Sequence, residues 1–247
     1  MSTVYNLKRE VEKPVRLTGG HRLCAGCGAG VVVAGVLRAL NKEDRAVVVN
    51  ATSCLQVSTF MYPYTAYMDS YIHSAFENSA ATCAGVEAAY NALQRRGKVE
   101  GTIKFITFAG DGGTYDIGFQ SLSGAMERGH DMVYVCYDNE AYMNTGVQRS
   151  SATPPAARTA TTMSVGPHPG NEFGQGKNVP QIAMAHEIPY VATATVADLH
   201  DLEYKVKKAM SIHGARYIHI FVPCPLGWGA ASHDTIKLSR LAVESGV

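Results

Sequence analysis

The chain lacks the features that mark several classes of protein. None of its 247 residues falls in an apolar run of about 18 or more, so we expect no membrane-spanning helix. Lys and Arg number 22 and Asp and Glu 21, which leaves no strong field of one sign to attract nucleic acid or an anionic membrane. The polar amino terminus has no apolar core of a signal peptide, so we expect a cytoplasmic protein.

Familiar nucleotide-binding motifs and internal repeats are also missing. The sequence contains neither the GxGxxG pattern nor a P-loop lysine. Hydrophobic residues make up 46% and charged residues 17%, a composition that can bury a core and excludes general disorder. The length suits one large domain, which we place at 1–247.

Apolar, β-branched runs alternate with segments of helical spacing along the chain. Nearly continuous apolar strands separated by helices predict an α/β fold, a parallel sheet with helices on both faces. The aromatic segment 63–73 is expected to be a connecting loop, and 145–180, rich in proline, a long irregular interaction loop within the domain. The predicted strands are 45–51, 102–110, 132–139, 188–196 and 216–224, and the predicted helices are 28–41, 77–98, 117–130 and 198–214.

The sharpest local signal is GDGG at 110–113, between a predicted strand and a predicted helix. Ligands of open parallel sheets bind outside the carboxyl ends of the strands, and glycines let a phosphate approach the backbone. Asp111 would repel a phosphate unless a divalent cation lay between them, and Mg²⁺ prefers such oxygen ligands. Asn139 and the carbonyl of Ala141, after the next strand, could complete that site. A tight turn without a ligand is the alternative.

Six cysteines require an explanation in a reducing compartment, where disulfides are rare. They are Cys24, Cys27, Cys54, Cys83, Cys136 and Cys224. The first two form a CxxC pair, and Cys54 and Cys224 each follow a predicted strand, at the same sheet edge as GDGG. Four thiolates there suit zinc or an iron–sulfur cluster, and one pair plus two distant singles favours the cluster; an empty site is the third alternative. Cys83 and Cys136 are expected to be buried core residues.

Five segments together resemble one protein family. They are 18–28 (TGGHRLCAGCG), 48–55 (VVNATSCL), 75–81 (AFENSAA), 110–150 and 222–229 (VPCPLGWG). In combination they are similar to the β subunits of 2-oxoacid:ferredoxin oxidoreductases of the pyruvate synthase type, from about residue 15 to the end of the chain. The resemblance implies a thiamine diphosphate-binding fold. It also implies oxidative decarboxylation of a 2-oxoacid to an acyl-CoA, with electrons passed to ferredoxin or a similar acceptor.

The resemblance also implies roles for individual residues. Cys24, Cys27, Cys54 and Cys224 match ligands of a [4Fe–4S] cluster. Asp111, Asn139 and the Ala141 carbonyl match Mg²⁺ ligands. The segments at Gly110, Asp111, Gly112 and Gly113 and at 139–144 match those that bind the diphosphate. Asn144 matches a catalytic asparagine near the reacting carbon, and Cys54 also lines the thiamine pocket.

Two positions depart from the family pattern, and two other functions compete with it. Ala29 stands where relatives commonly carry an acidic residue that contacts the cofactor, and Gly113 where some carry tryptophan. A non-redox thiamine decarboxylase or ligase subunit would leave Cys54 and Cys224 without a role. A zinc- or cluster-bearing binding module without chemistry would leave Asp111 and Asn139 unexplained. Pyruvate is the substrate expected by default, with phenylglyoxylate, a branched 2-oxoacid and oxalate as alternatives.

A thiamine enzyme also needs a carboxylate that hydrogen-bonds the aminopyrimidine ring, and that glutamate generally comes from a second α/β domain. One chain of 247 residues accommodates one such domain. Glu77 and Glu140 lie in segments already assigned to the diphosphate half. We therefore expect the glutamate on an α-type partner subunit, docked by the aromatic segment 60–72 and by 145–180. Gamma- and delta-type or ferredoxin-like subunits are expected as further partners.

Overall fold

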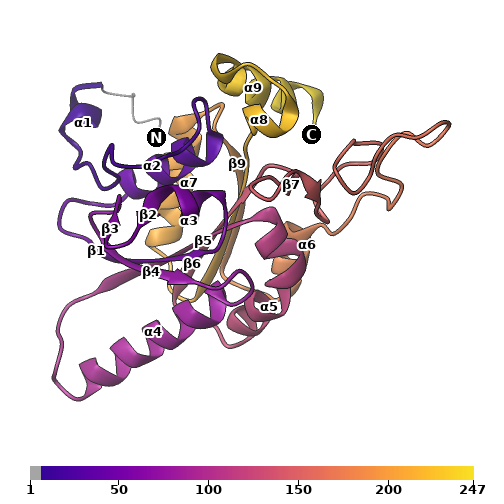
Figure 1. Cartoon of the computed structure of the whole chain (residues 1–247). Coiled ribbons are helices and arrows are strands. Elements are labelled where there is room, and N and C mark those ends of the chain that lie inside the picture. The colour runs from indigo at the N-terminus through magenta and orange to yellow at the C-terminus, as the bar shows by residue number, and fades with distance from the viewer. Residues whose placement is uncertain (1–6) are drawn as a thin grey trace.

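The computed structural model describes residues 7–247, and a sheet of six parallel strands runs through its centre (Figure 1). The strand order is β4-β1-β5-β6-β10-β9. The strands are β1 (Arg45–Ala51), β4 (Ser70–Ser74), β5 (Ile103–Gly110), β6 (Met132–Asp138), β9 (Tyr190–Thr195) and β10 (Ala215–Phe221). The α/β class and the parallel sheet predicted from the sequence are confirmed.

Helices cover both faces of the sheet. On one face, α2 (Gly28–Arg38), α3 (Cys54–Thr59) and α7 (Leu199–Met210) pack on a core that includes Val48, Ile106 and Ile218. On the other, α4 (Ser79–Arg95), α5 (Phe119–Glu127) and α6 (Val179–Ala185) cover a second core. This two-sided cover explains why the central strands are apolar on both faces.

Strand β6 shows that arrangement at the level of single residues. All seven of its residues are buried, with Val133 and Val135 in the first core and Tyr134 and Cys136 in the second. Side chains of a strand alternate between faces, so an apolar run serves both cores at once. Cys83 on α4 is also fully buried in the second core, as expected for a small core residue.

The expectation of a loop at 63–73 is wrong. Strand β3 (Tyr64–Thr65) pairs antiparallel with β2 (Phe60–Met61), and β4 pairs parallel with β1 to form an edge of the main sheet. β4 escapes recognition because an edge strand needs only one partner and here keeps polar, half-exposed residues. Its Tyr71 ring stacks on Tyr67, with centroids 4.8 Å apart, which explains the aromatic composition.

Most of 145–180 lacks regular structure, as predicted. It begins with β8 (Gln148–Arg149), which pairs with β7 (Ala141–Tyr142), and regular structure returns at α6. The stretch 150–178 between them, called the arm below, projects from the body of the molecule (Figure 1). The remaining elements are α1 (Leu7–Glu12), η1 (Gly112–Ile117), α8 (Pro225–Trp228), η2 (Ser232–Asp234) and α9 (Thr235–Ser245). Across residues 7–247, no helix combines the length and apolarity needed to cross a bilayer.

Candidate active site at the carboxyl edge of the sheet

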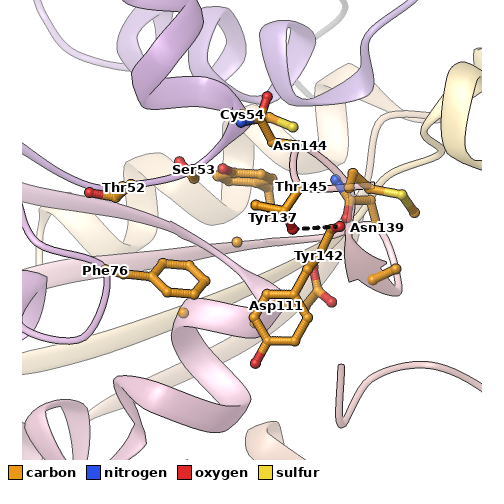
Figure 2. Close-up of a pocket in the computed structure, with 15 residues that line it drawn as sticks. Thr52, Ser53, Cys54, Phe76, Asp111, Tyr137, Asn139, Tyr142, Asn144 and Thr145 are labelled. Atoms are coloured by element: carbon orange, nitrogen blue, oxygen red, sulfur yellow. Dashed lines mark hydrogen bonds between the residues drawn. The ribbon is translucent and has the colours of Figure 1, made fainter. Parts of the chain in front are cut away.

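A pocket opens where β1, β5 and β6 end (Figure 2). Ligands of open parallel sheets bind at this edge. The residues that line the pocket lie at the end of a strand or in the segment that follows it. The lining residues are Thr52, Ser53, Cys54, Phe76, Gly110, Asp111, Gly112, Gly113, Tyr137, Asn139, Ala141, Tyr142, Met143, Asn144 and Thr145. The residues of the two predicted diphosphate-binding segments all lie among them, except Glu140.

The GDGG sequence leads from a strand directly into a wide helical turn. β5 ends at Gly110, which pairs with Tyr137 of β6, and η1 begins at Gly112. The Tyr142 ring lies directly on Gly112, because a Cβ atom placed there would be 2.3 Å from the ring carbon Cε1. The absence of a side chain at Gly112 therefore allows the segment after β6 to pack directly against the turn after β5.

Substitution of Gly112 by alanine tests this close approach. The added methyl group displaces the Tyr142 ring, and overpacking of this kind costs about 1–3 kcal/mol of stability. We expect binding of thiamine diphosphate to weaken at least about tenfold, because the displaced ring lies in the pocket wall. Gly85→Ala is the matched control, since a Cβ on that helical glycine meets no atom within 4 Å and alanine favours the helix. Calorimetric titration of both variants would contradict the assignment if Gly112→Ala bound normally.

Three oxygen-bearing groups converge beside the turn. The inward end of the Asn139 amide lies 3.0 Å from the Ala141 carbonyl oxygen and 3.1 Å from Asp111 Oδ1. If the amide nitrogen points inward it donates to both oxygens; if the amide oxygen points inward, three oxygens face one another. Neighbouring oxygen ligands of octahedral Mg²⁺, each about 2.1 Å from the ion, are roughly 3 Å apart. The donor set and its spacing therefore fit Mg²⁺.

The surroundings of Asp111 also favour a cation. Its side chain is 1% exposed, and its Oδ2 accepts a hydrogen bond from the Ser150 hydroxyl. Burial and the charge of Asp138 raise the pKa of Asp111 well above its ordinary value, against the lowering effect of Ser150. A buried carboxylate next to a second one is costly without a positive charge, and a bound divalent ion would remove that cost.

The residues around Asn139 hold this segment in an unusual backbone conformation. Glu140 has a φ of 69°, in the left-handed region, and its N–H donates to Asp138 Oδ1 over 2.9 Å. The Trp228 indole N–H donates to the Asn139 carbonyl over 3.1 Å. Non-glycine residues adopt this conformation rarely, and such residues concentrate at functional sites. Here it turns the chain so that Asn139 and Ala141 face the same point.

The four cysteines singled out in the sequence come from three elements next to the pocket. Cys27 precedes α2, Cys54 opens α3 and Cys224 precedes α8. Gly28, next to Cys27, packs closely against Val222 at the end of β10: a Cβ atom added to Gly28 would lie 2.9 Å from Val222 Cβ. The CxxC turn therefore lies near the end of that strand. Cys24 is exposed and the other three are partly exposed.

These four thiols lie near enough to influence one another. Burial raises the pKa of the Cys54 thiol to about 12, and the three other thiols add to that rise. Cys83 and Cys136, by contrast, are fully buried in the second core. Thiolates crowded together in this way are stable only next to cations, which fits a metal cluster. Within residues 7–247, no three His, Cys, Asp or Glu side chains are arranged to hold a single metal ion.

Asn144 and Met143 join the pocket to the cysteines. Asn144 lines the pocket together with Cys54 (Figure 2). The Met143 sulfur packs beside the turn after Cys224, since a Cβ on Gly227 would be 2.2 Å from it. Ala29, where relatives commonly carry an acid, is 2% exposed in the first core and offers no polar side-chain contact.

Several residues in the pocket wall or directly behind it escaped the sequence analysis. Ser150, which donates to Asp111, and Asp116, which binds Tyr142, were not singled out. Phe76 meets the Tyr142 ring edge-on, with centroids 5.7 Å apart. Ser150 is separated from Asp111 by 39 residues and lies in a segment without periodicity. A local pattern could not have revealed that contact.

Comparisons with known proteins agree on one family. Residues 50–220 match the C-terminal TPP-binding domain of thiamine pyrophosphate enzymes. The chain is 52% identical to pyruvate synthase subunit PorB of Methanothermobacter marburgensis, over 93% of this chain and 77% of that protein. It is 43% identical to ketoisovalerate oxidoreductase subunit VorB of Pyrococcus furiosus, over 99% and 78%.

A solved structure supports the fold. The chain is similar to a chain of 2-oxoglutarate:ferredoxin oxidoreductase from Magnetococcus marinus, solved with 2-oxoglutarate, coenzyme A and succinyl-CoA bound. The TM-score is 0.72 at 23% identity, over 91% of this chain and 71% of that one. At that identity the similarity concerns the arrangement of the elements.

Proposed function

This chain belongs to the PorB family of pyruvate synthase subunits, and we propose that it carries both the diphosphate half of the active site and a [4Fe–4S] cluster. Subunits of this family work in multi-subunit, thiamine pyrophosphate-dependent 2-oxoacid oxidoreductases. The complex would convert a 2-oxoacid and coenzyme A to an acyl-CoA and CO₂, and pass two electrons to ferredoxin or a similar acceptor. Residues 1–247 would form a single cofactor-binding domain.

One observation carries this proposal: two different donor sets border one pocket. Asp111, Asn139 and Ala141 present oxygen atoms on one side, and Cys54 presents sulfur on another. Oxygen ligands suit Mg²⁺, and thiolates suit iron–sulfur clusters. A non-redox thiamine enzyme has no use for the sulfur set, and a scaffold without chemistry has none for the buried carboxylate.

Each part of the pocket wall has a separate task. Asp111, Asn139 and the Ala141 carbonyl would hold Mg²⁺ against the diphosphate, and Gly112 lets the Tyr142 ring pack on the turn beside them. Thiamine diphosphate, when bound, supplies the electron sink for decarboxylation of a 2-oxoacid. Asn144 would orient the reacting group by hydrogen bonding, next to the cysteine side of the pocket.

Pyruvate is the substrate that we propose. Identity to a pyruvate synthase subunit, 52%, exceeds identity to a ketoisovalerate oxidoreductase subunit, 43%, over nearly the whole chain. Contacts to the substrate side chain would come largely from the partner half of the site. Phenylglyoxylate and branched 2-oxoacids are therefore the comparison substrates.

Two measurements on the purified complex test the function. An oxygen-free sample should show a broad absorption band at roughly 400 nm that bleaches with dithionite, as iron–sulfur proteins do. Pyruvate should bleach the same band in the presence of coenzyme A, faster than the comparison substrates. A colourless complex that still decarboxylates pyruvate would point to the non-redox alternative.

The cysteine assignment predicts a sharp division among the six residues. Changing Cys24, Cys27, Cys54 or Cys224 to alanine should lower iron and acid-labile sulfide content and block electron transfer to an external acceptor. Cys83→Ala and Cys136→Ala serve as matched controls, because both thiols are fully buried in the second core. Equal iron loss in all six variants would refute the choice of ligands.

Two exposed apolar segments suit the missing partner subunit. Tyr62 and Tyr64, on the β2–β3 hairpin, are 88% and 76% exposed. Met163, Val165 and Phe173 on the arm are also exposed. Exposed large apolar side chains on a protein surface are typical of interaction sites. We assign them to the α-type subunit, and deletion of the arm should release that subunit in size-exclusion chromatography.

A further inference from the structure

We propose that Asp116 is a positioning residue that fastens both ends of the arm to the diphosphate side of the pocket. The inference rests on the proposed function, because it concerns the site that would bind thiamine diphosphate. Asp116 itself does not line the pocket. Its effect would pass through Tyr142 and through the serines at the base of the arm.

The two oxygens of Asp116 gather donors from three separate segments. Oδ2 accepts hydrogen bonds from the Tyr142 hydroxyl, over 2.8 Å, and from the Ser151 N–H, over 3.1 Å. Oδ1 accepts from the Ser151 hydroxyl and lies 3.4 Å from Lys177 Nζ. Lys177 also donates to the Ser151 hydroxyl over 3.0 Å. One carboxylate thus binds residues that stand 26 positions apart on the arm.

The backbone confirms that the arm closes on itself at this point. A Cβ on Gly176 would be 1.7 Å from the Ser151 carbonyl oxygen, so the two ends of the arm are in direct backbone contact. Gly176 has a φ of 71°, in the left-handed region that favours glycine. The base of the arm is therefore a built feature, held by Asp116 on one side.

Two of these contacts connect Asp116 to the pocket: Tyr142 lines it, and Ser151 follows the residue that binds Asp111. The Tyr142 ring lies on Gly112 and meets Phe76. Ser150, the neighbour of Ser151, donates to Asp111. Loss of the Asp116 contacts would therefore free the pocket wall at Tyr142 and the hydrogen bond to Asp111 together.

The charge of Asp116 suits this role. Burial raises the pKa of Asp116, but hydrogen bonds from Ser151 and Tyr142 and the charge of Lys177 outweigh it and lower the pKa below its ordinary value. The ionised group accepts at both oxygens, whereas an asparagine accepts at one and presents an N–H₂ to donors at the other. Asp116→Asn keeps the shape and removes this pattern.

The test compares variants of the assembled complex by two readouts. Asp116→Asn should weaken binding of thiamine diphosphate in the presence of Mg²⁺ about tenfold or more, the size expected when hydrogen bonds to a charged group are lost. Hydrogen–deuterium exchange should accelerate in segment 141–153. Tyr142→Phe, which keeps the ring on Gly112, should show a smaller loss of affinity. Glu172→Gln, an exposed carboxylate bound to His168 on the arm, is the matched control and should change neither readout.

The outcomes separate this inference from the proposed function. If the wild-type complex binds no thiamine diphosphate, the proposed function fails, while faster exchange at 141–153 in Asp116→Asn would still support the fastening role. If the wild type binds and Asp116→Asn binds equally tightly, the positioning role is overturned. Unchanged exchange at 141–153, or acceleration spread evenly over the whole chain, also overturns it, because the effect would then be general destabilisation.

Discussion

Asp111→Asn should abolish the stabilisation that Mg²⁺ and thiamine diphosphate give to the wild-type complex. A ligand present at 100 times its Kd raises the free energy of unfolding by about 2.7 kcal/mol, which appears as a rise in the melting temperature. The amide replaces the charged oxygen nearest Asn139 and Ala141. Loss of this ligand should weaken metal-dependent cofactor binding by at least about 100-fold, and activity should fall with it.

Without Mg²⁺ and thiamine diphosphate, the same substitution should raise the melting temperature or leave it unchanged. Asp111 is buried next to Asp138, and both burial and that charge raise its pKa, so the ionised group is unfavourable in the folded chain. Asparagine carries no charge and can still accept from Ser150. The melting temperature of the ligand-free variant should therefore equal or exceed that of the wild type.

Asp201→Asn, a surface carboxylate paired with Lys205, is the control and should keep the full ligand-induced shift. A ligand-free Asp111→Asn chain that melts far below the wild type would contradict the metal assignment, because Asp111 would then be a structural residue. Differential scanning fluorimetry with and without Mg²⁺ and thiamine diphosphate measures both quantities. The control separates loss of a ligand from loss of any negative charge.

The parts of the fold that were predicted correctly are those with a long apolar run or a clear helical period, above all the strands buried on both faces. Strand β1 was predicted at 45–51 and has those bounds, because its β-branched run leaves no other good option. β4 was missed, since its residues SYIHS are half-exposed and owe their conformation to pairing with β1. α3 was missed because six residues are too few for a helical period; the Ser53 side chain caps it.

The candidate site, too, has residues that could be predicted from the sequence and residues that could not. Asp111 and Asn139 could be placed together from the sequence, since each follows a strand and the strands are neighbours. Cys54 and Cys224 could be placed at the same edge for the same reason, because each follows a strand. Ser150 and Asp116 could not, because their contacts depend on how an irregular segment folds back across the sheet edge. No residue propensity or sequence period predicts where an irregular segment folds back. The carboxyl ends of parallel strands, in contrast, follow a general rule, because ligands bind at that edge of the sheet.

The isolated chain, supplied with iron, sulfide, Mg²⁺ and thiamine diphosphate, should show no 2-oxoacid decarboxylation above background. Among residues 7–247, Asp111 is the sole carboxylate that lines the pocket, and it is assigned to the metal. Glu77 is exposed and outside the lining. A thiamine enzyme without its pyrimidine-side glutamate lacks the group that activates the cofactor. Addition of the α-type subunit should restore turnover by several orders of magnitude, since loss of an essential proton-transfer group costs about 10²–10⁴-fold.

Glu140 is the second acidic residue that the sequence analysis considered for that role. Burial and the neighbouring Asp138 raise the pKa of its carboxyl to about 7, a value suited to proton transfer. Glu140, however, lines a second cavity with Asp198, His219 and Arg240 and is absent from the lining of the first pocket. Glu140→Gln in the assembled complex should therefore keep most of its activity. Turnover by the isolated wild-type chain that Glu140→Gln eliminates would place the catalytic glutamate here instead of on the partner. We do not expect that result, because a carboxyl group that faces the second cavity does not reach the aminopyrimidine ring that it would have to protonate.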